Sequence, residues 1–335
     1  MLKHIDVRGS RYECGVQVGK QLKSAVQSRT SRHVPDGLLA RLKKDAERIY
    51  EVCREKYPQF IDELRGVADG AEVNFWKVFL LNCEELRDAE EGCTSIAEVS
   101  AGQATLTHNE DTGSESGDQQ SDCALITYHL DSLSLTAFAY GGGLPGDAYG
   151  WNSFGLFFSV NFLEPFTKHP SLDRVPRNFT GRALAEAKNL EDALQILKNS
   201  PDQSGYHYYI GFRGRVLSVE QYLDDVDVKE VTGVDAHANH YIHPKFAQSA
   251  PTSTSSKHRQ ERVEELIRNK SETLDILTDR ANAPYTICRL PEDNGLTLST
   301  VRFDSKKDEV TIYSPGTLKE EYSLPLTLPP PAASL

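Results

Sequence analysis

The sequence predicts a layered α+β domain, and three observations support this fold class. Roughly the first ninety residues carry the apolar spacing of amphipathic helices, whereas the chain after Gly92 breaks into short alternating runs typical of antiparallel strands. Two further helical segments interrupt these strands, and no internal repeat divides the chain. Hydrophobic residues make up 39% of the 335 residues and charged residues 26%, a balance that supports a substantial core. Groups of helices and strands in this order suit layers packed around one core.

Four helices are expected before residue 92. The first, residues 11–27, has Gly15 and Gly19 on one face, where another element can approach closely. The second has apolar residues at helical spacing and ends before Pro58, which cannot continue a helix. The ranges expected for the second to fourth helices are residues 38–55, 59–68 and 75–86.

The strands are expected after residue 92, as short runs bounded by Gly, Asp and Ser. Helices at residues 181–197 and 255–269 interrupt them. A closing hairpin is expected between residues 296–304 and 309–314, and the Pro-rich tail, residues 325–335, is expected to lie loose against the body. The other expected strands are residues 94–99, 104–108, 124–129, 134–140, 155–161, 206–212 and 215–221.

Charge and hydropathy argue against several classes of function. The chain has 37 Lys and Arg residues against 49 Asp and Glu residues, and the resulting net charge of −12 argues against a nucleic-acid partner. No apolar run approaches the roughly 18 residues that a membrane span requires, so no membrane association is expected. Residues 1–6 contain no apolar signal region, and the six cysteines form neither a C-x-x-C pair nor a disulfide framework, so a reducing, cytoplasmic location is expected.

A candidate nucleophile stands where the helical part ends and the strands begin. Cys93 follows Gly92 at the head of the first strand, where a thiol beside a flexible glycine can be accessible. An inert cysteine after a turn has the same pattern and is the more common case. Asp111 follows the next strand, and an antiparallel pairing would bring it back near the start of the first. There its carboxylate could orient an amine or a thiolate, although a solvated aspartate in an acidic loop would look the same.

Two asparagines are candidates for polar contacts in a site. Asn161 stands in an aromatic strand, where its amide is expensive to bury without partners and could hold a turn or supply an oxyanion hole. Asn239 stands among His237, His240 and His243, a spacing that permits a metal but matches no recognised ligand pattern. Sequence motifs for nucleotide and phosphate binding and for metalloproteases are also absent. We therefore expect neither a metal nor a cofactor.

Taken in order, these motifs resemble the penicillin acyltransferase family of N-terminal nucleophile hydrolases. The resemblance covers nearly the whole chain, and the ordered set is specific although each motif is weak alone. It implies an αββα sandwich whose precursor cuts its own chain before a cysteine. The motifs that carry it are Gly92-Cys93-Thr94-Ser95, His108-Asn109-Glu110-Asp111, Leu144-Pro145-Gly146, Gly150-Trp151-Asn152 with Gly155-Leu156, Val160-Asn161 and Ala238-Asn239-His240.

The resemblance implies a role for each candidate residue. Cys93 is the expected nucleophile, and the peptide bond between Gly92 and Cys93 is the expected cleavage site. Asp111 matches the acidic residue that positions the new amine, and Asn161 and Asn239 match two asparagines that bind the oxyanion. Cleavage would free an α-amine with a pKa of roughly 8, which can act as the base toward its own thiol. Attack of the thiolate on a substrate amide would then give a thioester.

Self-cleavage would also define the organisation of the chain. Residues 1–92 would form a helical segment and residues 93–335 the αββα catalytic segment, packed as one domain. The two fragments are expected to stay together as a heterodimer, and a higher oligomer is possible on this view.

The sequence departs from the related bile-salt and penicillin V hydrolases at two points. Those enzymes carry an arginine at the position of His108. They also have a catalytic arginine late in the sequence, which has no clear match here; Arg289 and Arg302 are the candidates. Bile-salt chemistry is therefore not expected.

Three functions fit the sequence. We prefer a self-processing cysteine amidohydrolase that cleaves small N-acyl amines, of the β-alanyl-amine type such as β-alanyl-dopamine or carcinine, since a negative protein attracts a cationic amide. An acyl-CoA-dependent N-acyltransferase is the alternative, and it would need a basic patch for the phosphates, of which no clear sign is present. The third is a catalytically silent scaffold in which Cys93 is replaceable.

Overall fold

The computed structural model describes residues 1–87, 92–113, 115–164, 171–200, 205–248, 250–293 and 295–329. The helices are α1 (Arg11–Gln21), α2 (Lys23–His33), α3 (Asp36–Lys56), α4 (Pro58–Ala71), α5 (Phe75–Leu81), α6 (Arg177–Leu184), α7 (Leu190–Asn199), α8 (Thr254–Arg268) and α9 (Thr273–Ile276), with short 3-10 turns η1 (Glu84–Leu86) and η2 (Gln120–Asp122). The strands are β1 (Lys3–Arg8), β2 (Thr94–Ser100), β3 (Gln103–Thr112), β4 (Cys123–Leu130), β5 (Leu133–Tyr140), β6 (Tyr149–Asn152), β7 (Leu156–Leu163), β8 (Gly205–Phe212), β9 (Arg215–Tyr222), β10 (Asp225–Glu230), β11 (Gly233–His237), β12 (Leu296–Asp304), β13 (Glu309–Ser314) and β14 (Lys319–Pro325).

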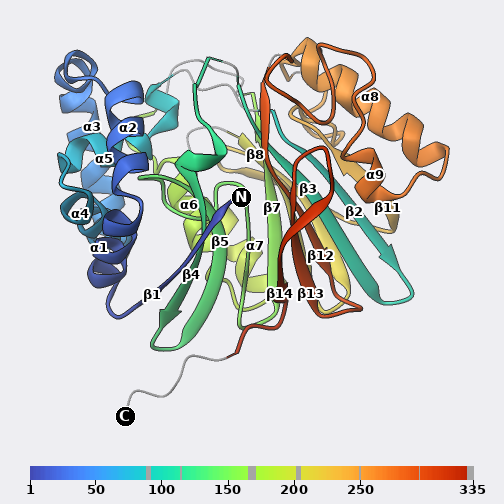
Figure 1. Cartoon of the computed structure of the whole chain (residues 1–335), viewed down its shortest axis with the longest axis horizontal. Helices are drawn as coiled ribbons and strands as arrows, with labels where there is room; N and C mark the ends of the chain where they lie inside the picture. The colour runs from blue at the N-terminus through green and yellow to red at the C-terminus, as the bar shows by residue number, and fades with distance from the viewer. Residues whose placement is uncertain are drawn as a thin grey trace.

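Two sheets form the centre of the molecule, and helices cover both outer faces (Figure 1). The described strands of the larger sheet run in the order β1-β4-β5-β6-β7-β8-β9-β10, and those of the smaller sheet in the order β11-β2-β3-β12-β13-β14. Helices α1 to α5 lie on the outer side of the larger sheet, and α8 and α9 lie on the outer side of the smaller one. The predicted α+β class and the αββα sandwich are therefore confirmed.

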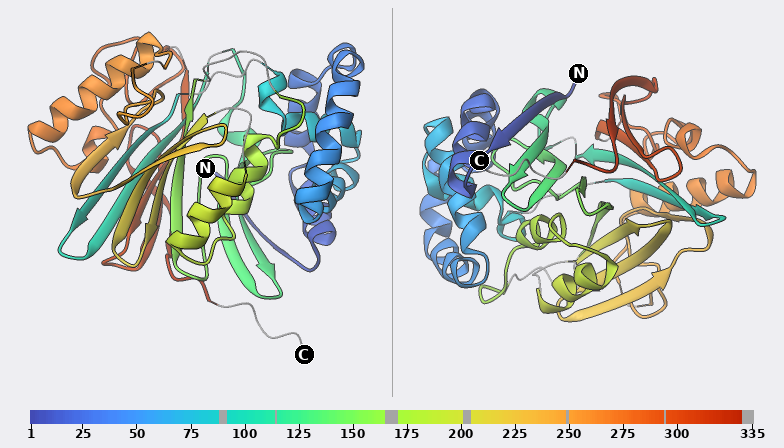
Figure 2. Two further views of the ribbon diagram at one scale, coloured as in Figure 1. Left: turned by 180° about the vertical axis from the view of Figure 1, so that it is seen from behind. Right: turned by 90° about the horizontal axis from the view of Figure 1, so that it is seen from below.

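Alternate residues of every strand face opposite sides of the sheet, so each sheet can present apolar side chains to the layers on both of its sides. Between the sheets, Phe157 of β7 stacks on Phe303 of β12 with ring centroids 5.3 Å apart. On the outer face of the larger sheet, α6 and α7 pack against β7 to β9 (Figure 2). On the outer face of the smaller sheet, Ile96 of β2 packs with Val263 of α8 and Leu277 beside α9. The space between the sheets at the head of β2 is polar instead, and it holds the candidate site.

The expected close approach at Gly15 and Gly19 is confirmed by the packing of α1 against α4. A Cβ atom on Gly15 would lie 2.1 Å from the carbonyl oxygen of Glu63, and one on Gly19 would lie 2.3 Å from that of Val67. Only glycine leaves room for backbones at this distance.

The structure corrects several predicted boundaries. The expected helix at residues 11–27 is divided at Leu22 into α1 and α2, and the expected helix at 181–197 is divided before Asn189, whose side chain caps α7. The first part of the tail, residues 325–329, does not lie loose, because Leu326 and Leu328 are buried in the core between the sheets. Residues 330–335 lie outside the described part. No helix among the described residues combines the length and apolar character that a membrane crossing requires.

Strands β1, β6, β10, β11 and β14 are not among those expected from the sequence. Strand β1 is short and half polar, yet it pairs in parallel with β4 over six residue pairs. The N-terminal segment is therefore not purely helical, because this strand forms the edge of the larger sheet. Strand β10 forms the opposite edge, with Asp225, Asp227 and Lys229 on one face, while Val226 on the other face packs against the apolar cluster that includes α7.

Candidate active site

Cys93 lies directly before β2, at one end of the space between the sheets. Because Thr94 pairs with Asn109, the thiol stands across from Glu110 on β3. The Cys93 Sγ donates a hydrogen bond to Glu110 Oε2 at 3.2 Å and lies 3.9 Å from the carbonyl oxygen of Asp111. The expectation of an accessible thiol is wrong for the intact chain, since the residue is 2% exposed, but its surroundings are polar rather than apolar.

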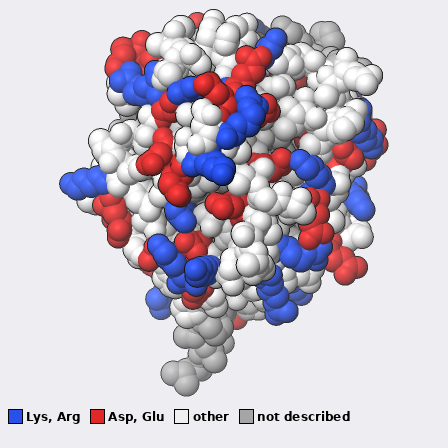
Figure 3. All heavy atoms as spheres, turned by 90° about the vertical axis from the view of Figure 1, so that its right-hand side faces the viewer, with Lys and Arg blue, Asp and Glu red and all other residues white. Residues whose placement is uncertain are grey.

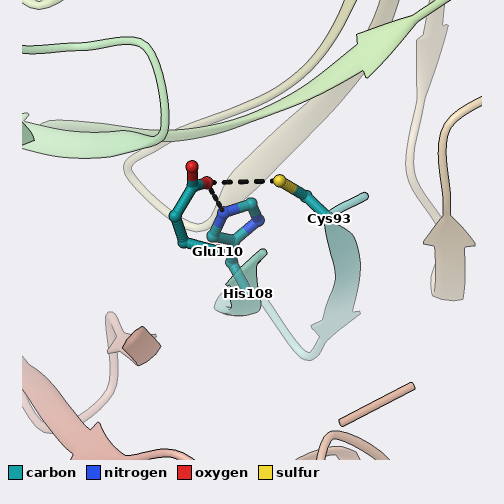
Figure 4. Close-up of side chains that lie close together, drawn as sticks. All are labelled: Cys93, His108 and Glu110. Carbon is teal, nitrogen blue, oxygen red and sulfur yellow. Dashed lines mark hydrogen bonds and ion pairs between the residues drawn. The ribbon is translucent and has the colours of Figure 1, made fainter. Parts of the chain in front are cut away.

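His108 and Glu110 share the face of β3 that meets the thiol. The imidazole of His108 and the thiol of Cys93 both point toward the Glu110 carboxylate (Figure 4). The His108 Nε2 atom lies 3.1 Å from Glu110 Oε2, and the hydroxyl of Tyr140 donates to Glu110 Oε1 at 2.5 Å. Burial raises the pKa of Glu110 to about 8, against the lowering effect of the hydrogen bonds from Tyr140 and Cys93. Burial lowers the pKa of His108 to about 3, so this imidazole is neutral at pH 7.

The carboxylate of Asp111 lies on the opposite face of β3. Its Oδ1 accepts a hydrogen bond from Thr297 Oγ1 at 2.6 Å, and its Oδ2 lies 3.7 Å from Arg289 Nε. Burial raises the pKa of Asp111 to about 6, and the charges of Arg289 and Arg259 oppose this shift. The antiparallel pairing thus brings Asp111 next to Cys93 through its backbone, while its side chain faces two arginines.

Asn161 lies inside the site, and both ends of its amide contact the protein. The Oδ1 atom accepts from Ser95 Oγ at 2.6 Å, and Nδ2 donates to the carbonyl oxygen of His237 at 3.1 Å. Ser95 Oγ also lies 2.8 Å from His108 Nδ1. A chain of hydrogen bonds therefore joins Asn161 to the Cys93 thiol, and the oxyanion role of Asn161 would need its second Nδ2 proton.

Arg259, which the sequence analysis did not single out, connects Asn239 to Cys93. Its Nη2 donates to Asn239 Oδ1 at 2.7 Å, and its Nη1 donates to the carbonyl oxygen of Cys93 at 2.5 Å and to Thr94 Oγ1 at 3.0 Å. The Asn239 Nδ2 donates to the carbonyl oxygen of Phe162 at 2.9 Å. Burial lowers the pKa of Arg259 to about 9, and the charge of nearby Arg289 acts in the same direction. No local sequence pattern predicts this contact, because α8 and β2 are far apart in the sequence.

Of the two candidate late arginines, Arg289 lies at the site. A Cβ atom on Gly92 would lie 2.5 Å from both Nη atoms of Arg289, so the guanidinium rests against the backbone of Gly92. The Arg289 Nη2 also donates to Ser255 Oγ at 2.8 Å. Arg302 instead contacts Asp304 at 3.3 Å, within its own strand β12.

Within the described part of the chain, one group of metal-type donor atoms converges. The thiol of Cys93, the imidazole of His108 and the carboxylate of Glu110 lie within 4.8 Å of one another. These atoms already share hydrogen bonds, so we interpret them as a proton-sharing network.

The three histidines near Asn239 each have a different hydrogen-bond partner. His237 Nε2 lies 2.9 Å from Glu220, His240 Nδ1 2.8 Å from Ser256, and His243 Nε2 3.0 Å from Ser218.

Comparison with known proteins identifies relatives of this chain. It is 29% identical over 219 residues to the β-alanyl-dopamine/carcinine hydrolase of Drosophila melanogaster, a match that covers 58% of this chain and only 56% of that protein. It is 22% identical over 334 residues to the 40 kDa form of the acyl-coenzyme A:6-aminopenicillanic-acid-acyltransferase of Emericella nidulans, covering 92% of this chain and 91% of that protein.

A solved structure and a family model also match. A mutant conjugated bile acid hydrolase from Clostridium perfringens aligns with 70% of this chain and 94% of its own, at 14% identity and a TM-score of 0.47. The model of the acyl-coenzyme A:6-aminopenicillanic acid acyl-transferase family matches residues 79–319, a range that takes in all the candidate site residues. With well over half of its length matched, the chain belongs to this family.

Proposed function

We propose that the chain is a self-processing cysteine amidohydrolase that cleaves small N-acyl amines through a thioester at Cys93. The observation that carries the proposal is the environment of Cys93. Its thiol donates to a buried carboxyl, and its carbonyl is bound by Arg259, which also holds Asn239. A nucleophile, a buried carboxyl that can exchange a proton with it, and the Arg259–Asn239 pair are thus assembled around Cys93, and acyl transfer uses groups of these kinds.

In this proposal the Gly92–Cys93 bond is cut first, and the freed α-amine then serves as the base. An α-amine has a pKa of roughly 8, which is close enough to neutral pH for the amine to accept and return a proton. Asp111 orients this amine; its backbone carbonyl lies 3.9 Å from Cys93 Sγ, and its carboxylate contacts Thr297 and Arg289. The thiolate attacks the substrate carbonyl, Asn161 and Asn239 donate to the oxyanion, the amine leaves, and water hydrolyses the thioester.

Two observations support a cationic β-alanyl acyl group as the substrate. One is the similarity to the fly hydrolase, which is named for β-alanyl-dopamine and carcinine. The other is Asp147, a buried carboxyl whose Oδ1 has no hydrogen-bond partner. Burial raises the pKa of Asp147, and the nearby carboxyls of Glu84 and Glu110 raise it further. The charge of Arg29 acts in the opposite direction, and a substrate ammonium group would add a positive partner for the unbonded Oδ1.

The Asp147→Asn substitution should therefore weaken binding of β-alanyl amines but not of N-acetyl amines. A hydrogen bond to a charged group contributes about 1.5–3 kcal/mol, so KM for the β-alanyl substrate should rise about 10- to 100-fold. Steady-state kinetics on both substrates measures the difference. Asp131→Asn, in the exposed turn after β4, is the matched control and should change neither KM. An equal rise in KM for both substrates would argue against the ammonium contact.

The acyltransferase remains the alternative, supported by the similarity to the fungal enzyme over most of its length. Coenzyme A carries several phosphates, which favour a patch of positive charge. On the face formed by α8 and α9, Lys and Arg alternate with Asp and Glu instead (Figure 3), and Arg262 pairs with both Asp279 and Glu265. This face therefore does not favour coenzyme A.

The first test of the proposal is the covalent state of the purified protein. Denaturing gels and mass spectrometry should show residues 1–92 and 93–335 as separate fragments, whereas size exclusion without denaturant should show one species. The fragments stay together because β1 pairs with β4 and because Glu63 of α4 forms a buried ion pair with Arg182 of α6 at 3.0 Å. A persistently intact chain would contradict self-processing.

The second test is the reaction. Amine release from a panel of N-acyl amines, with and without coenzyme A, separates a hydrolase from an acyltransferase. We expect release in water alone, with β-alanyl amines as the best substrates. Acyl transfer that depends on coenzyme A would favour the alternative.

A further inference from the structure

The base proposed for the mature enzyme does not exist in the uncut chain. Before cleavage, the nitrogen of Cys93 belongs to the Gly92–Cys93 peptide bond, and an amide nitrogen cannot accept the thiol proton. A different group must ionise Cys93 for the first cut. The inference below rests on the proposed self-cleavage and identifies that group.

The intact chain holds a carboxyl oxygen within hydrogen-bond distance of both the thiol and an imidazole. The Cys93 Sγ is 3.2 Å from Glu110 Oε2, which is 3.1 Å from His108 Nε2 (Figure 4). All three residues belong to the hairpin of β2 and β3, whose register fixes their positions before any cleavage. Their side chains are buried, so bulk water does not take the place of these partners.

Hydrogen-bond accounting gives the direction in which a proton can move. The carbonyl oxygen of His237 can only accept, so Asn161 must present Nδ2 to it and Oδ1 to Ser95. The single hydroxyl proton of Ser95 is thereby used, and His108 Nδ1 must carry the proton between the imidazole and Ser95. The His108 Nε2 atom is then a bare acceptor, and Glu110 Oε2 must be protonated to bond with it. The raised pKa of Glu110, about 8, agrees with this protonated state.

We propose that Glu110 and His108 form a proton relay that ionises Cys93 in the uncut precursor. The thiol proton passes to Glu110 Oε2 while the proton of Glu110 passes to His108 Nε2. The relay thus plays, for the first cut, the part that the free α-amine plays afterwards.

The covalent steps balance with water as the added reactant. The sulfur electron pair of Cys93 forms a bond to the carbonyl carbon of Gly92, and the C=O π electrons move onto oxygen. When this adduct collapses, the C–N bond to Cys93 breaks and its nitrogen takes a proton back through the relay, which leaves a thioester and a free α-amine. Water then adds to the thioester and releases the carboxylate of Gly92 and the thiol of Cys93.

Two arginines provide the positive charge that this step needs. Arg289 rests against Gly92, whose carbonyl oxygen becomes negative, and Arg259 donates to the carbonyl oxygen of Cys93. Both are buried beside the developing thiolate and oxyanion, where charges interact more strongly than in water.

The test is a time course of cleavage after cell-free synthesis of the full chain, followed by denaturing gels and mass spectrometry. Glu110→Gln and His108→Gln keep size and hydrogen bonding but cannot relay a proton. We expect each to slow cleavage about 10²- to 10⁴-fold, the usual contribution of a positioned acid or base. Matched controls are Glu98→Gln on the same strand pair as Cys93 and His129→Gln at the surface, both expected to cut at the wild-type rate.

A rescue experiment separates a relay from a packing role. Glu110→Ala should cut slowly in sodium chloride and faster in sodium formate, because formate can replace the missing carboxyl. Equal slow cleavage in both salts, or wild-type rates for both Glu110→Gln and His108→Gln, would overturn the relay while leaving self-cleavage intact. A wild-type chain that never cuts would instead overturn the proposed function itself.

Discussion

The Cys93→Ala variant should stay a single chain and release no amine from any N-acyl amine. Alanine removes the only sulfur at the head of β2, and with it both the attack on Gly92 and the thioester of turnover. Loss of a catalytic nucleophile costs on the order of 10⁶-fold in rate, so both effects should reach the detection limit. Denaturing gels measure the first effect and amine release the second. Because a thiol is a weak hydrogen-bond donor, loss of its contacts with Glu110 and with the Asp111 carbonyl should change the melting temperature little.

Two other cysteines provide matched controls for this variant. Cys14 and Cys53 are buried among the helices of the N-terminal segment, and burial raises the pKa of the Cys14 thiol to about 11. Cys14→Ala and Cys53→Ala should therefore be cut and should turn over substrate like the wild type. If Cys93→Ala is still cut after residue 92, or still turns over substrate, the catalytically silent scaffold with a replaceable Cys93 becomes the better hypothesis.

The sequence predicts the layers well because they depend on local periodicity. Helical spacing in the first part and alternation after Gly92 are repeated in the structure. Four of the missed strands share a cause, since β1, β10, β11 and β14 lie at sheet edges and are polar on at least one side. The fifth, β6, lies inside the larger sheet and is only four residues long. Their pairing is set by the neighbouring strand rather than by their own composition.

In the site, too, contacts between residues close in the sequence can be predicted, whereas contacts between distant segments cannot. Cys93 and Asp111 belong to one hairpin, so strand pairing alone brings them together. Strict alternation along β3 also places His108 and Glu110 on one face and Asp111 on the other, and the first face meets the thiol. This signal is present in the sequence, although the family motif marks Asp111 rather than its neighbours.

Strand alternation does not reveal Arg259, and the sequence offers Arg289 only as one of two candidates for the late catalytic arginine. Arg259 comes from α8, whose mixed charges are typical of a solvated helix, and yet its guanidinium is buried against Cys93 and Asn239. Arg289 reaches Gly92 from the segment before β12. Both contacts depend on how α8 and the neighbouring segments pack on the smaller sheet, which no local pattern encodes.

The Asn239→Ala variant should fold and be cut, but it should lose most of its turnover. Asn239 is fixed by Arg259 at 2.7 Å and by the carbonyl oxygen of Phe162 at 2.9 Å, so its amide is held in place before substrate arrives. Removal of one donor to an oxyanion costs about 10²- to 10³-fold in kcat. The loss should appear in kcat rather than KM, because the oxyanion forms only in the transition state.

The Asn239→Asp variant distinguishes an oxyanion donor from a support for Arg259. Aspartate keeps an oxygen acceptor for the Arg259 guanidinium but has no amide protons to donate. If Asn239 binds the oxyanion, kcat should fall at least as far as in Asn239→Ala, since a carboxylate also repels the negative oxygen. If Asn239 only positions Arg259, Asn239→Asp should keep nearly full kcat while Asn239→Ala loses it. Kinetics of the two cut variants, with their melting temperatures compared, therefore decide which contact of Asn239 matters for the reaction.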